Sequence, residues 1–245
     1  MKFDIVTIFP DMVRALLSEG VVGRASGHGG ILDIEVHDLR SFTTDRHRTV
    51  DDVPYGGGPG MVMKPEPFVR ALEKIHKTRG VPDEVVLTSP QGVLFSHPEA
   101  VRLSGLRHLV LLCGRYKGVD ERVREEVATK EISVGNYVLS GGETPAAVIL
   151  EAVGRLVPGV VGDIESISSD SFSRNLLDHP HYTRPAILGV RRVPDVLVSG
   201  NHAEIRRWRK REAIRRTMKQ RPDLLAQAAL DSEEQDALKE LQQLQ

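Results

Sequence analysis

Two glycine-rich segments of this chain carry polar residues at spacings that suit a bound ligand. The first runs from Ser133 to Pro145, and the second runs from Asp51 to Gly60. Glycine loses more conformational freedom on ordering than any other residue, so a run of glycines marks positive φ angles or a close approach of the backbone to another group. Because loops of this kind often carry function, we interpret both segments as ligand-binding loops rather than ordinary turns.

The first segment is one of three polar or glycine-rich tips that follow predicted strands. The other two are Thr88–Gly92 and Cys113–Gly118. In an open parallel sheet the ligand lies outside the carboxyl ends of the strands, so the three tips are expected to meet. Backbone groups there could read the edge of a purine ring, and Tyr137 and Leu139 could cover its faces. An ordinary turn explains any one tip, but three converging tips favour a purine ligand.

A second constellation is basic. Residues Asn201 to Arg211 form a predicted helix with Lys and Arg side chains nearly all around it. Asn201 suits the N-cap, and Glu204 stands at the third position of a capping box. Ile205 and Trp208 are three residues apart and are expected to dock the helix on its own domain. Few acidic residues lie at pairing distance along the helix, so we predict that its cations neutralise nucleic-acid phosphates.

The charge of the chain is distributed unevenly. From Arg191 to Arg221 there are eleven Lys or Arg residues and three Asp or Glu residues, a net charge of +8. The whole chain carries −1, which leaves −9 for the remainder. This asymmetry favours a polyanionic partner for the basic segment.

Motifs of several other enzyme classes are absent. The chain has no Gly-x-x-x-x-Gly-Lys-Ser/Thr, no Gly-x-Gly-x-x-Gly after a predicted strand and no Gly-x-Ser-x-Gly. P-loop hydrolases, the usual dinucleotide-binding fold and α/β-hydrolases are therefore disfavoured. Asp178, His179 and His181 could be drawn as metal ligands, but their proline-flanked loop offers no helix or strand to fix the geometry, so we predict no metal site there.

Cysteine usage and hydropathy favour a cytoplasmic protein. Cys113 is the single cysteine, so an intramolecular disulfide and a thiolate zinc site are both excluded. We expect neither a signal peptide, because the apolar run at the N-terminus is short and contains Asp4, nor a membrane span.

Strand-like and helix-like patterns alternate up to about Pro158. The predicted strands are Phe3–Ile8, Ile31–His37, Glu84–Thr88, His108–Cys113 and Glu131–Val134. The predicted helices are one from Pro10 that Gly20 closes, Pro65–Thr78, Val119–Ala128 and Glu143–Val157. Strands separated by helices indicate an α/β fold with a mostly parallel sheet and helices on both faces.

The pattern changes after Pro158. A stretch rich in glycine and serine follows, and beyond it Asn201–Lys219 and the tail from Arg221 are expected to be helical, the last residues as a solvated polar helix. We predict an α/β ligand-binding domain at residues 1–160, a flexible linker at 161–176 that folds over a ligand, and a small helical C-terminal domain at 177–245.

Motifs along nearly the whole chain resemble those of the bacterial tRNA (guanine-37-N1)-methyltransferases of the SPOUT class. The most specific motifs are Val138–Glu143 and the stretch that begins at Ser199 and ends at Trp208. The remaining matches, in order, are Phe9–Met12, His47–Gly60, Ser89–Gly92, Gly114–Tyr116, Val134–Pro145, Asp170–Phe172, Asp178–Pro185 and Arg209.

The resemblance implies a deep C-terminal trefoil knot in the α/β domain that holds S-adenosylmethionine between the three tips. Knots are rare, and nothing in the composition indicates one. The expected cofactor-binding residues are Leu87, Thr88, Ser89, Pro90, Gln91, Gly114, Tyr116, Ser133, Val134, Gly135, Asn136, Tyr137, Val138, Leu139, Gly141, Gly142 and Pro145. It further implies a homodimer with active sites between the subunits.

The implied reaction moves a methyl group to N1 of the guanosine at tRNA position 37. Guanine N1 carries a proton, so the reaction needs a general base, for which Asp170 matches the family's residue. Arg155 matches the residue that stabilises charge at O6. The target base must leave the anticodon-loop stack. The expected RNA contacts on the anticodon stem-loop are His47, Asp51, Gly58, Gly60, Asn201, His202, Arg206 and Arg209.

Two residues depart from the family pattern. Lys117 follows the Gly114–Tyr116 triplet where many members carry Glu, a carboxylate associated with the guanine edge and with Mg²⁺ dependence. A Lys cannot coordinate Mg²⁺, so we expect Mg²⁺ dependence to be weaker or to use other groups. Asn136 stands where an acid is common, which makes the loop less negative.

Two other functions are compatible with parts of the sequence. A SPOUT enzyme acting on another RNA would share the knot but should lack the Asp170–Arg184 pattern and the Asn201–Arg209 helix. A non-catalytic RNA-binding sensor would need neither a base such as Asp170 nor a cation such as Arg155.

Overall fold

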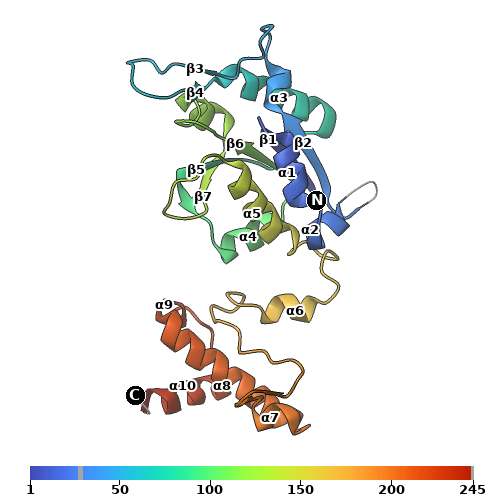
Figure 1. The fold of residues 1–245 in the computed structure, drawn as a ribbon, viewed down its shortest axis with the longest axis vertical. Helices are drawn as coiled ribbons and strands as arrows, with labels where there is room; N and C mark the ends of the chain where they lie inside the picture. The colour runs from blue at the N-terminus through green and yellow to red at the C-terminus, as the bar shows by residue number, and fades with distance from the viewer. Residues whose placement is uncertain (27–29, 244–245) are drawn as a thin grey trace. The chain divides into compact units, whose positions relative to one another are not determined.

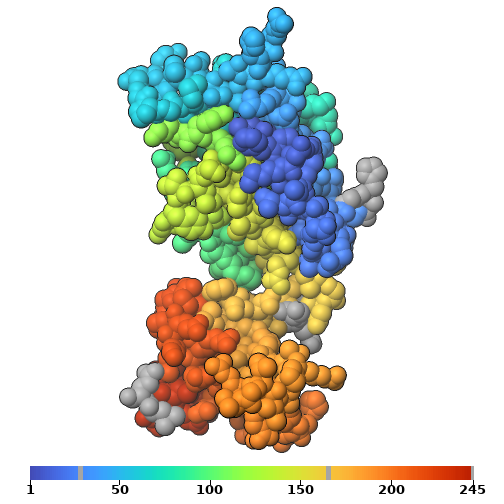
Figure 2. All heavy atoms as spheres, viewed as in Figure 1, coloured from blue at the N-terminus to red at the C-terminus, as the bar shows by residue number. Residues whose placement is uncertain are grey.

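The computed structural model describes residues 1–26 and 30–243 of the chain. It divides into two compact units, Met1–Gly162 and Asp163–Gln245 (Figures 1 and 2). Each unit has its own buried hydrophobic residues. Among the described residues, no helix has both the length and the apolar character that crossing a membrane requires.

The first unit contains a five-stranded parallel sheet. Its strands are β1 (Lys2–Thr7), β2 (Asp33–Asp38), β5 (Glu84–Leu94), β6 (His108–Cys113) and β7 (Lys130–Ser133), in the order β2-β1-β6-β5-β7. Every neighbouring pair is parallel, which confirms the predicted α/β fold with a mostly parallel sheet. All residues of β6 are buried, as expected of a central parallel strand.

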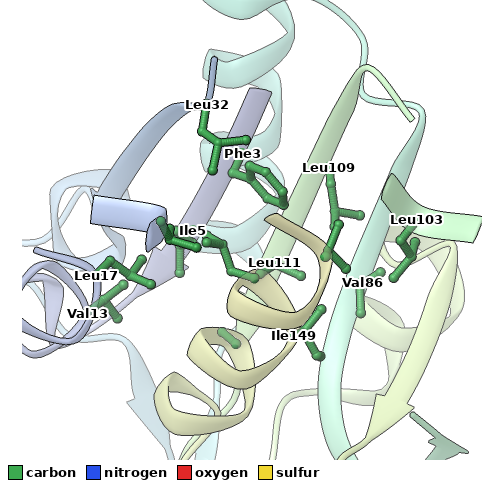
Figure 3. Packing of buried hydrophobic residues seen from close by; sticks show 14 of the residues in the cluster. Phe3, Ile5, Val13, Leu17, Leu32, Val86, Leu103, Leu109, Leu111 and Ile149 are labelled. Atoms are coloured by element: carbon green, nitrogen blue, oxygen red, sulfur yellow. The ribbon is translucent and has the colours of Figure 1, made fainter. Parts of the chain in front are cut away.

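One face of the sheet is covered by four helices. These are α1 (Pro10–Leu17), α2 (Gly20–Ala25), α4 (His97–Ser104) and α5 (Glu143–Gly154). Phe3 and Leu111 of the sheet pack in one buried cluster with Val13 of α1 and Ile149 of α5 (Figure 3). The cluster fixes the start of α5, and with it the end of the glycine-rich segment that precedes the helix.

The opposite face is covered by α3 (Pro65–Arg79), by a 3-10 helix at Leu39–Phe42 and by a π-helical turn at Val123–Val127. Phe68 and Ile75 of α3 are fully buried in a second cluster with Val110 and Leu112 of β6. Helices therefore lie on both faces, as predicted.

Three local predictions were wrong. Gly20 does not close a single helix; it takes a φ of 75° and begins α2, which the sequence did not indicate, and α4 was also missed. The helix predicted at Val119–Ala128 is only the short π-helical turn. The first residues of the predicted helix are not helical, because Asp120 N donates to the backbone oxygen of Met63 at 2.9 Å.

The second glycine-rich segment is a loop between two short antiparallel strands, β3 (Asp51–Asp52) and β4 (Val62–Met63). Within it, Gly56, Gly57, Gly58 and Gly60 all have positive φ angles. A side chain at these positions would be strained, so glycine is needed here for the backbone conformation.

The second unit contains the helices α6 (Ile164–Ser169), α7 (Asp195–Val198), α8 (His202–Gln220), α9 (Pro222–Leu225) and α10 (Ser232–Gln243), with a hairpin of β8 (Ile187–Leu188) and β9 (Arg191–Arg192). Its core joins Leu176, Ile214 of α8 and Leu241 of α10. Arg174 donates to the buried carboxylate of Glu234 at 2.7 Å.

Most of the segment for which the sequence predicts a flexible linker, 161–176, belongs to this second unit, which begins at Asp163. Leu176 is buried, and Asn175 Nδ2 donates to the backbone oxygen of Gln227 at 3.1 Å. The C-terminal helix was interpreted as solvated, and most of α10 is exposed, but Glu234 and Leu241 are buried and pack the helix on its unit.

Candidate active site

The three tips predicted to form a ligand site surround one hollow. Two of them follow β6 and β7, but Thr88–Gly92 was wrongly predicted to follow a strand, because β5 continues to Leu94 and this tip lies within it, at the register irregularity between Thr88 and Val93. The volume of the hollow is about 470 Å³, within the range of small-molecule sites. Of the expected cofactor residues only Asn136 is not part of its wall. The others that line it are Leu87, Thr88, Ser89, Pro90, Gln91, Gly114, Tyr116, Ser133, Val134, Gly135, Tyr137, Val138, Leu139, Gly141, Gly142 and Pro145.

Glycine at position 142 lets two of the tips touch. Gly142 N donates to Gly114 O at 2.8 Å. A Cβ atom on Gly142 would lie 2.8 Å from Cα of Cys113 and would collide with Oγ1 of Thr88. The segment that enters α5 therefore lies directly against the paired residues Thr88 of β5 and Cys113 of β6, and only a residue without a side chain fits there.

The loop between β7 and α5 presents backbone donors to the hollow. Among the described residues, no protein group accepts a hydrogen bond from the N–H groups of Val138, Leu139 or Ser140. The Tyr137 ring packs against Gly135, where a Cβ atom would collide with it, and its hydroxyl donates to Val134 O at 3.2 Å. With Leu139 at its wall, the hollow offers polar edges and apolar faces, the combination that a purine nucleoside requires.

A buried ion pair ties this loop to two other segments, and the sequence did not assign it a role. Arg115 Nε donates to Glu143 at 3.0 Å, and Thr7 Oγ1 donates to the same carboxylate at 2.7 Å. The Arg115 guanidinium also lies over the Phe9 ring, 4.4 Å from its centroid. Arg115 and Glu143 belong to the motifs Gly114–Tyr116 and Val138–Glu143. Their pairing could not be predicted, because the two residues are far apart in the sequence.

Arg155 lies at the opposite end of α5 from the hollow. The helix has 12 residues, so its two ends are about 18 Å apart. Glu143 is the first residue of α5 and follows the loop that lines the hollow, whereas Arg155 is the C-cap of the helix. The structure does not bring Arg155 to the hollow of its own chain.

The loop expected to contact RNA approaches the hollow at one position. A Cβ atom on Gly60 would lie 2.9 Å from the side chain of Lys117, which lines the hollow. His47, Asp51 and Gly58 are not part of the hollow's wall. The turn that carries His47 is held by Asp45, which accepts hydrogen bonds from the backbone N–H groups of His47 and Thr49 at 3.1 Å. The Thr49 N–H bond and others hold the pKa of Asp45 below its ordinary value.

The second unit contains a hollow of its own, about 360 Å³ in volume. Asp170, Arg206 and Arg209 all line it, so three predicted site residues meet here. Asn201 and His202 are not part of its wall. Asn201 caps α8 as predicted, since its Oδ1 accepts from Glu204 N at 3.3 Å.

Several cations of α8 are paired by acids that the sequence analysis did not consider. Lys210 donates to Asp231 at 2.7 Å and to Glu233 at 2.5 Å. Arg206 and Arg209 form no ion pair with any described residue and are exposed. The cations left for a polyanion are therefore a subset of those that the composition suggested.

A family profile described as tRNA (Guanine-1)-methyltransferase TrmD matches residues 1–227. The chain belongs to this family. Relatives named tRNA (guanine-N(1)-)-methyltransferase include one from Dictyoglomus turgidum, 50% identical over 98% of this chain and 96% of the relative. One from Geobacter metallireducens is 50% identical over 99% of this chain and 98% of the relative. One from Chloroflexus aggregans is 52% identical over 94% of this chain and 89% of the relative.

Membership of the tRNA (guanine-1)-methyltransferase family confirms the resemblance seen in the sequence and makes the chain a methyltransferase. A non-catalytic sensor is therefore disfavoured. The family's S-adenosylmethionine fits the first hollow by the observations above: unpaired backbone donors, apolar walls and glycines that admit close backbone approach.

In this member of the tRNA (guanine-1)-methyltransferase family, Lys117 is held between two loops. Its N–H donates to Met61 O at 3.0 Å, and its side chain covers Gly60.

In the second unit, donor atoms of Asp178, His179 and His181 lie within 4.8 Å of one another, closer than the proline-flanked loop led us to expect. Asp178 already accepts a hydrogen bond from His181 Nε2 at 2.7 Å.

Proposed function

We propose that this protein transfers the methyl group of S-adenosylmethionine to N1 of the guanosine at position 37 of tRNA. Two findings support the proposal together. The chain belongs to the tRNA (guanine-1)-methyltransferase family, and the segments Thr88–Gly92, Cys113–Gly118 and Ser133–Pro145 enclose one nucleoside-sized hollow.

The tips around the first hollow would hold the cofactor. Backbone N–H groups of Val138 to Ser140 would meet the edge of the adenine, and Leu139 would cover a face. When bound, S-adenosylmethionine supplies an electrophilic methyl group on a sulfonium. We further propose that the chain is knotted here. The close packing of Gly142 against Thr88 and Cys113 supports this, as does a register shift in the β5–β7 pairing between Thr88 and Val93.

Asp170 is proposed as the general base that takes the proton from guanine N1. Its position in a hollow with Arg206 and Arg209 supports this role, because a guanosine held by its phosphates there would meet the carboxylate. Arg155 is proposed to stabilise the negative charge that develops at O6 as the proton leaves.

The position of Arg155 supports a homodimer with shared active sites. Arg155 is about 18 Å from the start of α5, so it would serve the hollow of a second copy rather than its own. The packed helices α1 and α5 expose Phe9, Met12, Leu16 and Val148, each about 40–50% accessible. Apolar side chains gathered in this way suit an interface with a second copy.

The substrate is proposed to be the anticodon stem-loop. His47, Asp51, Gly58 and Gly60 would contact the target base and its 5′ neighbour. The second unit, through Asn201, His202, Arg206 and Arg209, would bind the phosphates. Residues 161–176 would order over the bound RNA between the proposed catalytic and RNA-binding domains. Mg²⁺ remains a candidate cofactor with a role weakened by Lys117.

The reaction is tested by transfer of labelled methyl from S-adenosylmethionine to two tRNA transcripts that differ only at position 37. We expect label on the guanosine transcript and none on the adenosine transcript. Label on neither, with the cofactor shown to bind, would contradict the proposed substrate.

The shared active site is tested by mixing two inactive variants after subunit exchange. One is Arg155→Ala, and the other is Gly142→Ala, which is expected to lose the cofactor. If Arg155 serves the partner's hollow, each mixed dimer has one complete site, and activity returns. If Arg155 serves its own hollow, no mixed dimer has a complete site, and the mixture stays inactive.

A further inference from the structure

Four rings gather on the surface of the second unit without a role in the proposed reaction. His179 lies 4.4 Å from His181 and 6.3 Å from Trp208, measured between ring centroids. Tyr182 lies 6.4 Å from Trp208. We refer to His179, His181, Tyr182 and Trp208 as the aromatic cluster. Three members come from one loop, and Trp208 comes from α8.

The loop of the aromatic cluster is held in place by its polar neighbours. Asp178 accepts from His181 Nε2 at 2.7 Å, which fixes the angle of that ring. The Nδ1–H group of His179 donates to Pro180 O at 3.2 Å. Burial lowers the pKa of His179 and outweighs the opposing effects of the hydrogen bond to Pro180 O and of the nearby Asp178. The two histidine rings are thus held by hydrogen bonds, and Trp208 lies against His179 and Tyr182.

Core packing does not account for this arrangement. The core of the second unit joins Leu176, Ile214 and Leu241 and does not include the cluster. Tyr182 is 50% exposed, and the side chain of His181 is 69% exposed. Fixed aromatic rings with exposed faces are the means by which proteins stack unpaired RNA bases.

The surroundings of the aromatic cluster have the charge that such a ligand requires. His179 also lines the hollow that contains Arg206 and Arg209, which are both exposed and form no ion pair with a described residue. A base stacked on the rings would therefore have its phosphate within the reach of flexible Arg side chains. Rings beside free cations are the recurring arrangement of single-stranded RNA sites.

We propose that the aromatic cluster stacks an unpaired base of the RNA loop other than the one that is methylated. The inference rests on the proposed function, because it takes the loop to be that of the substrate tRNA. It adds a specificity determinant to that function: the enzyme would require an unpaired loop, not only a polyanion.

Trp208 is the only tryptophan of the chain, so its fluorescence reports on the cluster directly. The full-length protein is titrated, without S-adenosylmethionine, with an anticodon stem-loop RNA and with a fully paired RNA of the same length. We expect the stem-loop to quench Trp208 and to bind more tightly than the duplex. Tyr182→Ala should weaken stem-loop binding about tenfold and leave duplex binding unchanged.

Two further variants separate stacking from other effects. Tyr182→Phe keeps the ring and should retain the affinity for the stem-loop. Arg207→Ala is the matched control on α8, because Arg207 is exposed and already pairs with Glu204 at 3.3 Å. Thermal unfolding of each variant checks that the second unit remains folded.

Equal binding of stem-loop and duplex, or an unchanged affinity in Tyr182→Ala, would overturn the stacking proposal. So would quenching of Trp208 by polyglutamate to the same extent as by RNA, which would make the cluster a docking surface for an acidic protein. Methyl transfer to the guanosine transcript is measured separately. Intact stacking without transfer would contradict the proposed reaction alone, and transfer without stacking would contradict this inference alone.

Discussion

Arg115 and Glu143 form a buried ion pair, with 3.0 Å between Arg115 Nε and the carboxylate, that joins two loops of the candidate active site. Only 1% of the Glu143 side chain is exposed, and Thr7 at the end of β1 donates to the same group. The pair thus fixes the end of the glycine-rich loop to the centre of the sheet.

Arg115→Ala should destabilise the protein by about 3–5 kcal/mol, because it leaves a buried carboxylate without its cation. The free energy of unfolding from urea titration checks this, and calorimetry should show weaker binding of S-adenosylmethionine. Arg122→Ala is the control, since Arg122 pairs with Asp120 at 2.8 Å at an exposed site and should change stability by less than about 1 kcal/mol. Equal effects of the two variants would contradict the structural role of the Glu143 pair.

Gly142→Ala should abolish tight cofactor binding. The added Cβ atom would meet backbone atoms of Cys113 and Gly114 at 2.8 and 2.9 Å, and backbone cannot move aside as a flexible side chain can. Overpacking of this kind costs about 1–3 kcal/mol. Gly162→Ala is the matched control, because nothing lies within 4 Å of its added Cβ atom. Calorimetric affinity for the cofactor distinguishes the two variants.

Acid should unfold the first unit partly through Asp4. Burial alone would raise the pKa of Asp4, but hydrogen bonds from His37, His108 and Arg79 outweigh it, so the pKa lies below the ordinary 3.8. Between the two pKa values the unfolded chain binds more protons, so this contribution is present above pH 3.8 and is lost as the pH falls below it. Unfolding free energy measured against pH should fall less steeply there for Asp4→Asn than for the wild type. Parallel curves would argue against the Asp4 contribution.

Lys117→Glu should make methyl transfer more dependent on Mg²⁺. Lys117 lines the hollow and its stem covers Gly60, so a carboxylate at this position could reach a cation near the target base. Transfer is measured against chelator concentration for both proteins. A strict Mg²⁺ requirement already in the wild type would show that other groups supply the site.

The salt dependence of RNA binding should identify the cations that meet phosphates. Arg206→Ala and Arg209→Ala should each reduce the slope of log affinity against log salt by about one. Arg207→Ala should leave the slope nearly unchanged, since Arg207 pairs with Glu204. A smaller slope only for Arg207→Ala would place the phosphate path on the other side of α8.

The sheet could be predicted from the sequence because several of its strands are short apolar runs, which are stable only when buried inside a sheet. His108–Cys113 is buried at every residue, and β6 has the predicted bounds. The hollow could be predicted because ligand sites follow from parallel topology. Its wall includes sixteen of the expected residues, so only Asn136 is placed away from it.

Contacts between distant residues could not be predicted in the same way. Thr7 and Glu143 are 136 residues apart, and no local pattern links them. The short helix α2 begins at a glycine that reads as a helix end, because packing of Val22 in the core overrides the local preference. The acids of α10 were interpreted as a solvated face because their partners on α8 are remote in sequence.

The pairing of α10 with α8 would make the C-terminal helix an internal competitor for the RNA phosphates that we propose α8 binds. Asp231 and Glu233 hold Lys210, and Glu234 holds Arg174, so the chain already neutralises part of its own basic surface. Asp231→Asn combined with Glu233→Gln would leave Lys210 unpaired while keeping Leu241 in the core of the unit. Such a chain would bind polyanions of every kind more strongly and would distinguish less between a cognate loop and bulk nucleic acid.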